Sequence, residues 1–239
     1  ILYPEYFREI KNRVLNKRKI IHKFEYENNF YNRHAFINKA ISNYKDCKYL
    51  EIGVDNNQVF NSIPIKMSNK YGVDPYQGGN LRMTSDNFFK EYNDLKFDVI
   101  FIDGLHEYEQ CQRDCLNSMK HLNKGGIILF HDFLPRSYFE ETVPRKQSSW
   151  TGDVWKVAVE LVNSKNLEFK IINIDMGIGV LKIKDNYVYN KIDKLKESSF
   201  NEYLNYKKTL PIITCEEGLD FISKNHPEKV IFSGEGADE

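Results

Sequence analysis

Short apolar runs that stop at glycine or polar residues recur along this chain, and segments of helical periodicity separate them. The clearest run is 98–104, and similar runs occupy 48–54, 70–74 and 127–130. Helical spacing of apolar residues marks the segments 33–44, 59–65, 85–95, 107–122 and 154–162. Strands that alternate with helices in this way are typical of βαβ units with right-handed crossovers.

Two more strands, at 169–174 and 179–183, flank Met176 and Gly177 and predict a closing hairpin. The predicted fold class is therefore α/β, a doubly wound, Rossmann-like and mostly parallel sheet that closes with an antiparallel β-hairpin. The 239 residues suit one large domain with appendages. We expect an N-terminal helical extension over 1–32, the main domain over 33–186, and a C-terminal helical extension and tail over 187–239.

Composition limits the partners that we expect. Lys and Arg together number 34, as do Asp and Glu, so no net charge recruits nucleic acid or an acidic membrane. A basic cluster before residue 24 favours a solvated helix face over an anion-binding surface. No apolar run has the ~18 residues of a membrane span. The cysteines are Cys47, Cys111, Cys115 and Cys215, and the four-residue spacing of Cys111 and Cys115 in a helical pattern suits neither a disulfide framework nor a zinc site. We therefore predict reduced thiols and a cytoplasmic protein.

In a doubly wound sheet, ligands bind beyond the carboxyl ends of the strands. Gly53 ends the first strand and allows close approach of a ligand to the backbone, while Glu51 can face a cationic group. Asp74 ends the second strand, where a carboxylate can accept hydrogen bonds from ribose hydroxyls. Ser85 and Asp86 follow in a segment that can cap a helix or lie beside a base.

Acids and histidines also follow the next two strands. Asp103, Gly104 and His106 end one strand, and His131 and Asp132 end the other. Two acids and two histidines at one sheet edge are unusual in a pure scaffold, so these residues favour an active site.

Several ordered motifs carry a family resemblance: YLEIGV at 49–54, GVDP at 72–75, MTSDNFF at 83–89, FDVIFIDGLH at 97–106 and GGIILFHD at 125–132, followed by GDVWK at 152–156 and GIGV at 177–180. The chain resembles class I S-adenosylmethionine-dependent methyltransferases of the "methyltransferase domain 24" type. The resemblance implies methyl transfer from S-adenosylmethionine. It also implies a set of cofactor-binding residues, namely Glu51, Gly53, Val54, Asp74, Ser85, Asp86, Asp103 and Gly104.

The same resemblance leaves two chemistries open at the strands that the family numbers fourth and fifth. Related catechol-type O-methyltransferases hold a divalent metal there, and the matching positions are Asp103, His131 and Asp132. A histidine in place of an oxygen ligand suits a softer metal than magnesium, or none. Alternatively His131 or His106 takes the proton of an acceptor hydroxyl, with Asp132 beside it, and we favour this histidine base.

The acceptor side is predicted from an aromatic segment. Trp150, Asp153, Trp155 and Lys156 follow a long irregular stretch, and aromatic faces stack well on sugar rings. Packing of Trp155 against the sheet is an equal alternative. The family resemblance implies O-methylation of a glycan or small-molecule hydroxyl.

Three rival functions remain. A nucleotide-dependent oxidoreductase would need Gly-x-Gly-x-x-Gly after the first strand, where this chain has GVDNNQ at 53–58. A catalytically inactive S-adenosyl-binding module would have the same fold and bind the cofactor without catalysing methyl transfer. The ending IFSGEGADE at 231–239 resembles asparagine-synthetase-type ATP pyrophosphatases, but their Ser-Gly-Gly-x-Asp-Ser loop is missing from this sequence.

Overall fold

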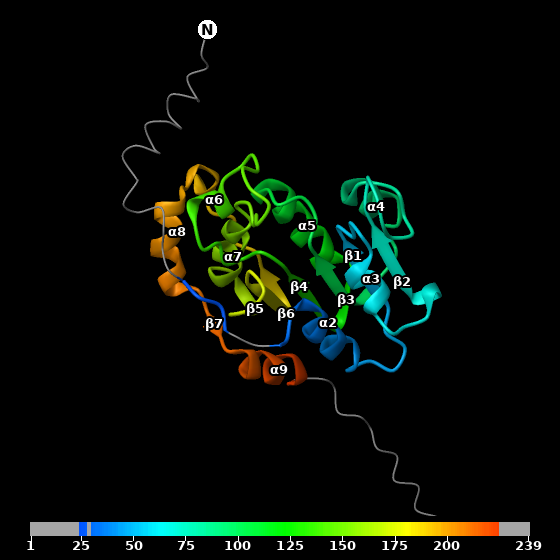
Figure 1. Cartoon of the computed structure of the whole chain (residues 1–239). Coiled ribbons are helices and arrows are strands. Elements are labelled where there is room, and N and C mark those ends of the chain that lie inside the picture. Colours follow the sequence, from blue (N-terminus) through cyan, green and yellow to red (C-terminus); the bar gives the residue numbers. More distant parts are fainter. Residues whose placement is uncertain (1–23, 28–29, 225–239) are drawn as a thin grey trace, which may run out of the picture.

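A seven-stranded sheet forms the centre of the protein (Figure 1). The computed structural model describes residues 24–27 and 30–224. The strand order is β2-β1-β3-β4-β6-β5-β7. The strands are β1 (Tyr49–Ile52), β2 (Lys70–Val73), β3 (Phe97–Ile102), β4 (Leu122–Phe130), β5 (Lys165–Ile172), β6 (Ile178–Val188) and β7 (Ile212–Ile213).

Parallel pairing joins β2, β1, β3 and β4, whereas β6 is antiparallel to both β4 and β5. The predicted fold class, a mostly parallel α/β sheet closed by an antiparallel hairpin, is therefore confirmed. Only the helix α4 (Ser85–Glu91) lies between β2 and β3 in the chain, so no named strand corresponds to the family's third. The strands that the family numbers fourth and fifth are therefore β3 and β4 here. The short strand β7 adds a parallel edge beside β5.

Helices cover both faces of the sheet. Successive side chains of a strand point to opposite faces, and the buried strands carry apolar residues on both. Ile100 packs into one core with α5 and α7, while Val99 and Phe101 pack into the other with α2 and α9. The helices are α2 (Arg33–Ile41), α3 (Gln58–Ser62), α4 (Ser85–Glu91), α5 (Tyr108–Lys120), α6 (Tyr138–Glu141), α7 (Trp155–Val162), α8 (Phe200–Tyr206) and α9 (Cys215–Ser223), with 3₁₀ turns η1 (Met67–Asn69), η2 (Leu195–Glu197) and η3 (Lys207–Thr209).

The C-terminal segment 189–224 packs against the sheet and its helices. Besides β7, it contributes α9, which packs against α2. Strand β6 continues to Val188, two residues past the boundary that we predicted at 186. The basic cluster before residue 24 and the pyrophosphatase-like ending at 231–239 lie outside the described residues. Within the described part, no helix has the length and apolar character needed to cross a membrane.

Candidate active site

A pocket of about 920 Å³ opens at the carboxyl ends of β1, β2, β3 and β4. Its lining includes most of the residues that the sequence predicted for the site, namely Glu51, Gly53, Val54, Asp74, Ser85, Asp103, Gly104, His106, His131, Asp132 and Trp150. The topology explains this convergence, since parallel neighbouring strands end at the same edge of the sheet.

Gly53 makes the tight turn that begins the pocket. Its φ is +81°, and a Cβ on it would lie 2.1 Å from the backbone oxygen of Asp103. A side chain is therefore excluded by both conformation and space. This close approach of the loops after β1 and β3 brings Val54 to the pocket wall.

The carboxylate of Asp74 is surrounded by backbone donors. Oδ2 accepts from the N–H groups of Val54 and Asp55, both at 3.1 Å. Oδ1 accepts from Tyr76 at 2.8 Å and Gln77 at 3.0 Å. Burial alone would raise the pKa of Asp74, but these four bonds outweigh it and lower the pKa. Asp74 thus fixes the loops after β1 and β2, and its predicted bonds to a ribose would share oxygens that are already in use.

Glu51 is a buried acid at the base of the pocket. Its side chain is 1% exposed, and its Oε2 accepts a hydrogen bond of 2.8 Å from the hydroxyl of Tyr49. Burial raises the pKa of Glu51 to about 8, and this exceeds the lowering effect of that bond. At neutral pH the side chain is therefore mostly protonated.

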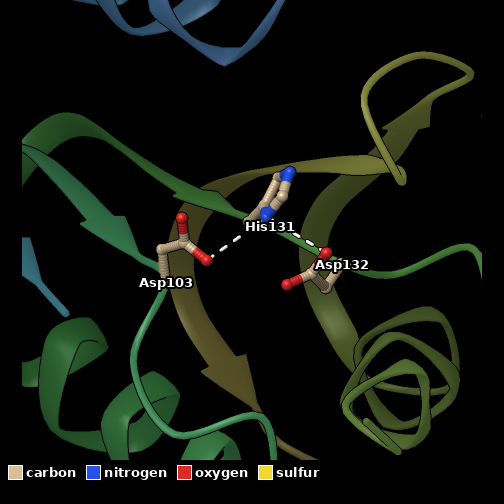
Figure 2. Close-up of side chains that lie close together, drawn as sticks. All are labelled: Asp103, His131 and Asp132. Carbon is tan, nitrogen blue, oxygen red and sulfur yellow. Dashed lines mark ion pairs between the residues drawn. The ribbon is translucent and has the colours of Figure 1, made fainter. Parts of the chain in front are cut away.

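The strand-end cluster consists of Asp103, His106, His131 and Asp132. Figure 2 shows His131 between the two carboxylates, with its Nδ1 3.2 Å from Asp103 Oδ1 and 3.1 Å from Asp132 Oδ1. His106 Nδ1 lies 3.1 Å from Asp132 Oδ2, and His106 Nε2 lies 3.5 Å from Asp103 Oδ1. Asp103, His131 and Asp132 each offer one potential metal-ligand atom, and these three atoms lie within 4.8 Å of one another.

Close approach in this cluster does not produce well-formed hydrogen bonds. His131 and Asp132 are 3% and 2% exposed, yet both ring nitrogens and both carboxylate oxygens lack a partner with good hydrogen-bond geometry. Asp132 also adopts a φ of +69°, which is uncommon for any residue with a side chain. Buried polar atoms without partners are costly, so their presence here marks a ligand site.

Electrostatics within the cluster follow from its carboxylates. Burial opposes a charge on His131, but Asp132 and then Asp103 raise its pKa well above the usual value. The pKa of His106 is raised in the same way, by Asp132 against the effect of burial. Both histidines therefore tend to hold a proton when no other cation neutralises the carboxylates.

Two further charged residues reach the cluster from distant parts of the chain. Arg33, at the start of α2, donates from Nη1 to Asp103 at 2.8 Å and from Nε and Nη2 to Asp175 at 2.9 and 3.0 Å. Asp175 lies in the turn between β5 and β6, where its φ is +47°. Its Oδ1 is 3.5 Å from His131 Nε2. Neither Arg33 nor Asp175 was predicted as a site residue, and the only signal in the sequence was the turn at Met176 and Gly177.

Trp150 forms one wall of the pocket. Its indole ring stacks on His106 with centroids 5.0 Å apart and an interplanar angle of 20°. Its Nε1 donates to the backbone oxygen of Thr142 at 2.8 Å, and the Arg145 guanidinium lies 5.8 Å from the ring. Bonds within the segment 142–150 therefore hold Trp150 in place, together with the hydrogen bond between His106 Nδ1 and the Trp150 backbone oxygen at 2.9 Å.

Four of the predicted site residues lie away from this pocket. Trp155 is fully buried in the core and donates to Glu141. Lys156 donates to Asp153 at 2.8 Å, and Asp153 also accepts from the backbone N–H of Tyr108. The exposed carboxylate of the fourth, Asp86, lies 3.4 Å from Arg113.

Residues 38–133 match the family model described as a methyltransferase domain, of the type named methyltransferase domain 24. The chain therefore carries an S-adenosylmethionine-dependent methyltransferase domain. This confirms the family predicted from the ordered motifs. The matched segment spans β1 to the end of β4, so it contains Gly53, Asp74 and the strand-end cluster. No curated protein matches the chain in sequence.

Among solved structures, the methyltransferase resembles an O-methyltransferase from Bacillus cereus in complex with SAH, with 10% identity and a TM-score of 0.49 over 77% of this chain and 93% of the other. A SAH-bound methyltransferase from Podospora anserina has 15% identity and a TM-score of 0.43 over 77% and 98%. The O-methyltransferase TomG from Streptomyces achromogenes, in complex with SAM, has 9% identity and a TM-score of 0.43 over 77% and 100%.

Proposed function

We propose that this methyltransferase transfers the methyl group of S-adenosylmethionine to a hydroxyl oxygen of a small molecule or glycan. One observation carries the proposal. The pocket that contains Gly53 and Asp74 also contains the buried, unsatisfied side chains of His131 and Asp132. A donor site and a proton-handling site thus share one cavity, as methyl transfer to a hydroxyl requires.

At the donor end, the turn at Gly53 and the backbone at Val54 accommodate the cofactor close to the strand ends. We assign the cationic amino-acid part of the cofactor to the side of Glu51 and Asp103, where carboxyl groups face the pocket. The ribose lies at the loop that Asp74 holds, and the base lies toward Ser85 and Gly104. Negative side chains in a partly closed cavity favour a sulfonium cation over an anionic dinucleotide.

The strand-end residues fit a divalent metal ion. Asp103, His131 and Asp132 offer ligand atoms within 4.8 Å of one another, and the atoms of the last two lack other partners. The formal charges of Asp103, Asp132 and Asp175 exceed that of Arg33 by two, which one divalent cation would balance. A mixed nitrogen and oxygen set suits manganese, iron or zinc better than magnesium. Such an ion, when bound, would lower the pKa of an acceptor hydroxyl.

A histidine base is the second candidate, and the position of His106 favours it. Its ring lines the pocket beside Trp150, so an acceptor that stacks there would place a hydroxyl near His106 or His131. Because the flanking carboxylates raise the pKa of each histidine, a base at either position becomes active only at a pH above the ordinary histidine range.

The acceptor faces the wall made by Trp150, with Arg145, Ser148 and Ser149 on the same side of the pocket. A flat aromatic face with polar neighbours suits a sugar or a phenol. The balanced charge of the chain gives no support to a nucleic acid acceptor. A cytoplasmic location remains part of the proposal, and it is supported by four cysteines that are all unpaired.

The test of the proposed donor is calorimetry of the purified protein with S-adenosylmethionine, S-adenosylhomocysteine and NAD. We expect binding of both S-adenosyl compounds and none of NAD. Binding of NAD alone would overturn the proposal in favour of the oxidoreductase. Mass spectrometry should then detect S-adenosylhomocysteine when hydroxyl acceptors such as catechols and sugars are supplied. Cofactor binding without turnover on any acceptor would identify an inactive binding module.

Chelation separates the two chemistries. If a metal supports the reaction, exhaustive chelation abolishes turnover and an added divalent ion restores it. If a histidine is the base, turnover survives chelation and rises with pH. Cofactor affinity, measured in the same samples, should change much less than turnover, because Asp103 is the one residue that the donor end shares with the metal ligands.

A further inference from the structure

Asp114 is a buried acid that lines the pocket but takes no part in the chemistry proposed above. It lies on α5 and is 1% exposed. The strand order places α4, which follows β2, on one side of β3, while His131 and Asp132 follow β4 on the other side. The start of α4 therefore lies on the β2 side of the pocket, and Asp114 is connected to it through Gln110 and Ser85.

Ser85, Gln110 and Asp114 are joined by one amide group. Gln110 Nε2 donates to Ser85 Oγ at 3.1 Å and to Asp114 Oδ1 at 3.0 Å. Both N–H bonds of this amide are thus used within the group. Its carbonyl oxygen accepts from Arg113. The Ser85 side chain also interacts with the carboxylate of Asp114. The second carboxylate oxygen accepts no bond from Gln110 and lies beside Gly104, where a Cβ would be 3.7 Å from it. This oxygen can accept a hydrogen bond from a ligand.

A carboxylate oxygen in such a place accepts hydrogen bonds and donates none. Burial raises the pKa of Asp114 to about 6, so the group is mostly ionised at neutral pH. The absence of a bulky side chain at Gly104 leaves space for a flat ring beside the carboxylate. A ring that carries an amine would satisfy Asp114, whereas a ring with a carbonyl at that position would place two acceptors face to face.

We propose that Asp114 recognises the exocyclic amine of the cofactor's adenine and so selects adenine over hypoxanthine. The inference rests on the proposed function, since it concerns the donor. Alternatively, Asp114 is only a clasp, by which we mean a structural link that joins α5 to α4 through the hydrogen bonds of Gln110 to Asp114 and Ser85. A clasp affects all ligands alike, but recognition of the amine affects only the choice between bases.

Calorimetry with S-adenosylhomocysteine and S-inosylhomocysteine distinguishes these roles, because the second compound has an oxygen in place of the amine. The wild-type protein should prefer the adenosyl compound by roughly tenfold to hundredfold, as expected for a bond to a charged group. In Asp114→Asn, one oxygen can still accept from Gln110, and the new amide can donate to the inosyl oxygen. We expect the preference to fall below about threefold.

Glu109→Gln is the matched control, because Glu109 lies on α5 with Asp114 but is exposed, outside the pocket lining and paired with Lys196. This variant should keep the wild-type preference. If Asp114→Asn weakens both ligands in parallel, or leaves the preference unchanged, Asp114 is only a clasp and the inference fails. If the wild-type protein binds neither compound, the proposed donor itself fails and the inference fails with it.

Discussion

Two carboxylates that follow strands along the same edge of the sheet have opposite hydrogen-bonding environments. Asp74, after β2, accepts four backbone hydrogen bonds and holds two loops together. Asp132, after β4, is just as deeply buried, but neither of its oxygens has a partner with good hydrogen-bond geometry. The first group is satisfied by the protein alone, whereas the second faces only two histidines at 3.1 Å.

This difference separates a preformed part of the site from a part that needs a ligand. A satisfied network makes a rigid surface, so the loops around Gly53 are ready before a cofactor arrives. Unsatisfied buried atoms and a residue at positive φ cost stability, and such strain is concentrated at functional sites. We therefore expect substitutions at Asp74 to damage structure and binding, and substitutions in the strand-end cluster to damage turnover.

The largest expected effect is on turnover in His131→Ala. Removal of a metal ligand or of a base should lower turnover by roughly 10²–10⁴-fold. Cofactor affinity should change by less than about threefold, because His131 reaches the donor end only through Asp103. The measurement is the rate of S-adenosylhomocysteine formation, with calorimetry on the same protein. Full activity in this variant would move the chemistry to His106, the next histidine in the pocket.

A matched pair of substitutions gives the second effect. In Asp74→Asn, an amide N–H replaces an oxygen that accepts two bonds, so we expect a loss of about 1–3 kcal/mol in stability and a tenfold to hundredfold loss in cofactor affinity. In Asp132→Asn, a buried carboxylate without good hydrogen bonds becomes neutral, but His131 and His106 lose the charge that raises their pKa values. We therefore expect a smaller loss of stability than in Asp74→Asn. Chemical denaturation measures both. A greater loss of stability in Asp132→Asn than in Asp74→Asn would contradict the proposed contrast.

The sequence predicted the preformed part well because its signals are local. The apolar run before Asp103 and the glycine at 53 each occur within a few residues, and parallel pairing then brings their ends together. The strand-end cluster was predicted for the same reason, since Asp103, His131 and Asp132 each end a strand.

What the sequence left out depends on contacts between distant segments. Arg33 and Asp175 are separated by 142 positions, and no local pattern connects the start of α2 with the hairpin turn. Asp114 resembles any polar residue on a helix until α4 is placed beside α5. The position of Trp155 was open because an aromatic residue at helical spacing suits either a core or a pocket wall, and only the packing of α7 decides between them.

The smallest expected effect concerns pH and Glu51, the acid beside the preformed loops. Its pKa of about 8 lies above the usual value, so the free protein loses stability as the pH rises from the ordinary carboxyl range through 8. A cationic cofactor binds better to the ionised form. We therefore expect affinity for S-adenosylmethionine to rise with pH, by at most about tenfold per unit, and to level off above pH 8. Calorimetry between pH 6 and 9 measures this.

Glu51→Gln separates this effect from titration of the cofactor itself. The amino group of S-adenosylmethionine also titrates near pH 8, and it does so equally with both proteins. The ratio of the wild-type and Glu51→Gln affinities therefore reports the ionisation of Glu51 alone. At pH 6, wild-type Glu51 must give up a proton to pair with the cation of the cofactor. At that pH we expect the affinity of the wild type to be equal to or lower than that of Glu51→Gln. Toward pH 8, the affinity of the wild type should increase relative to that of Glu51→Gln. A ratio that stays constant over the whole range would mean that Glu51 faces Tyr49 rather than the cofactor, and that the cation of the donor is neutralised by Asp103 instead.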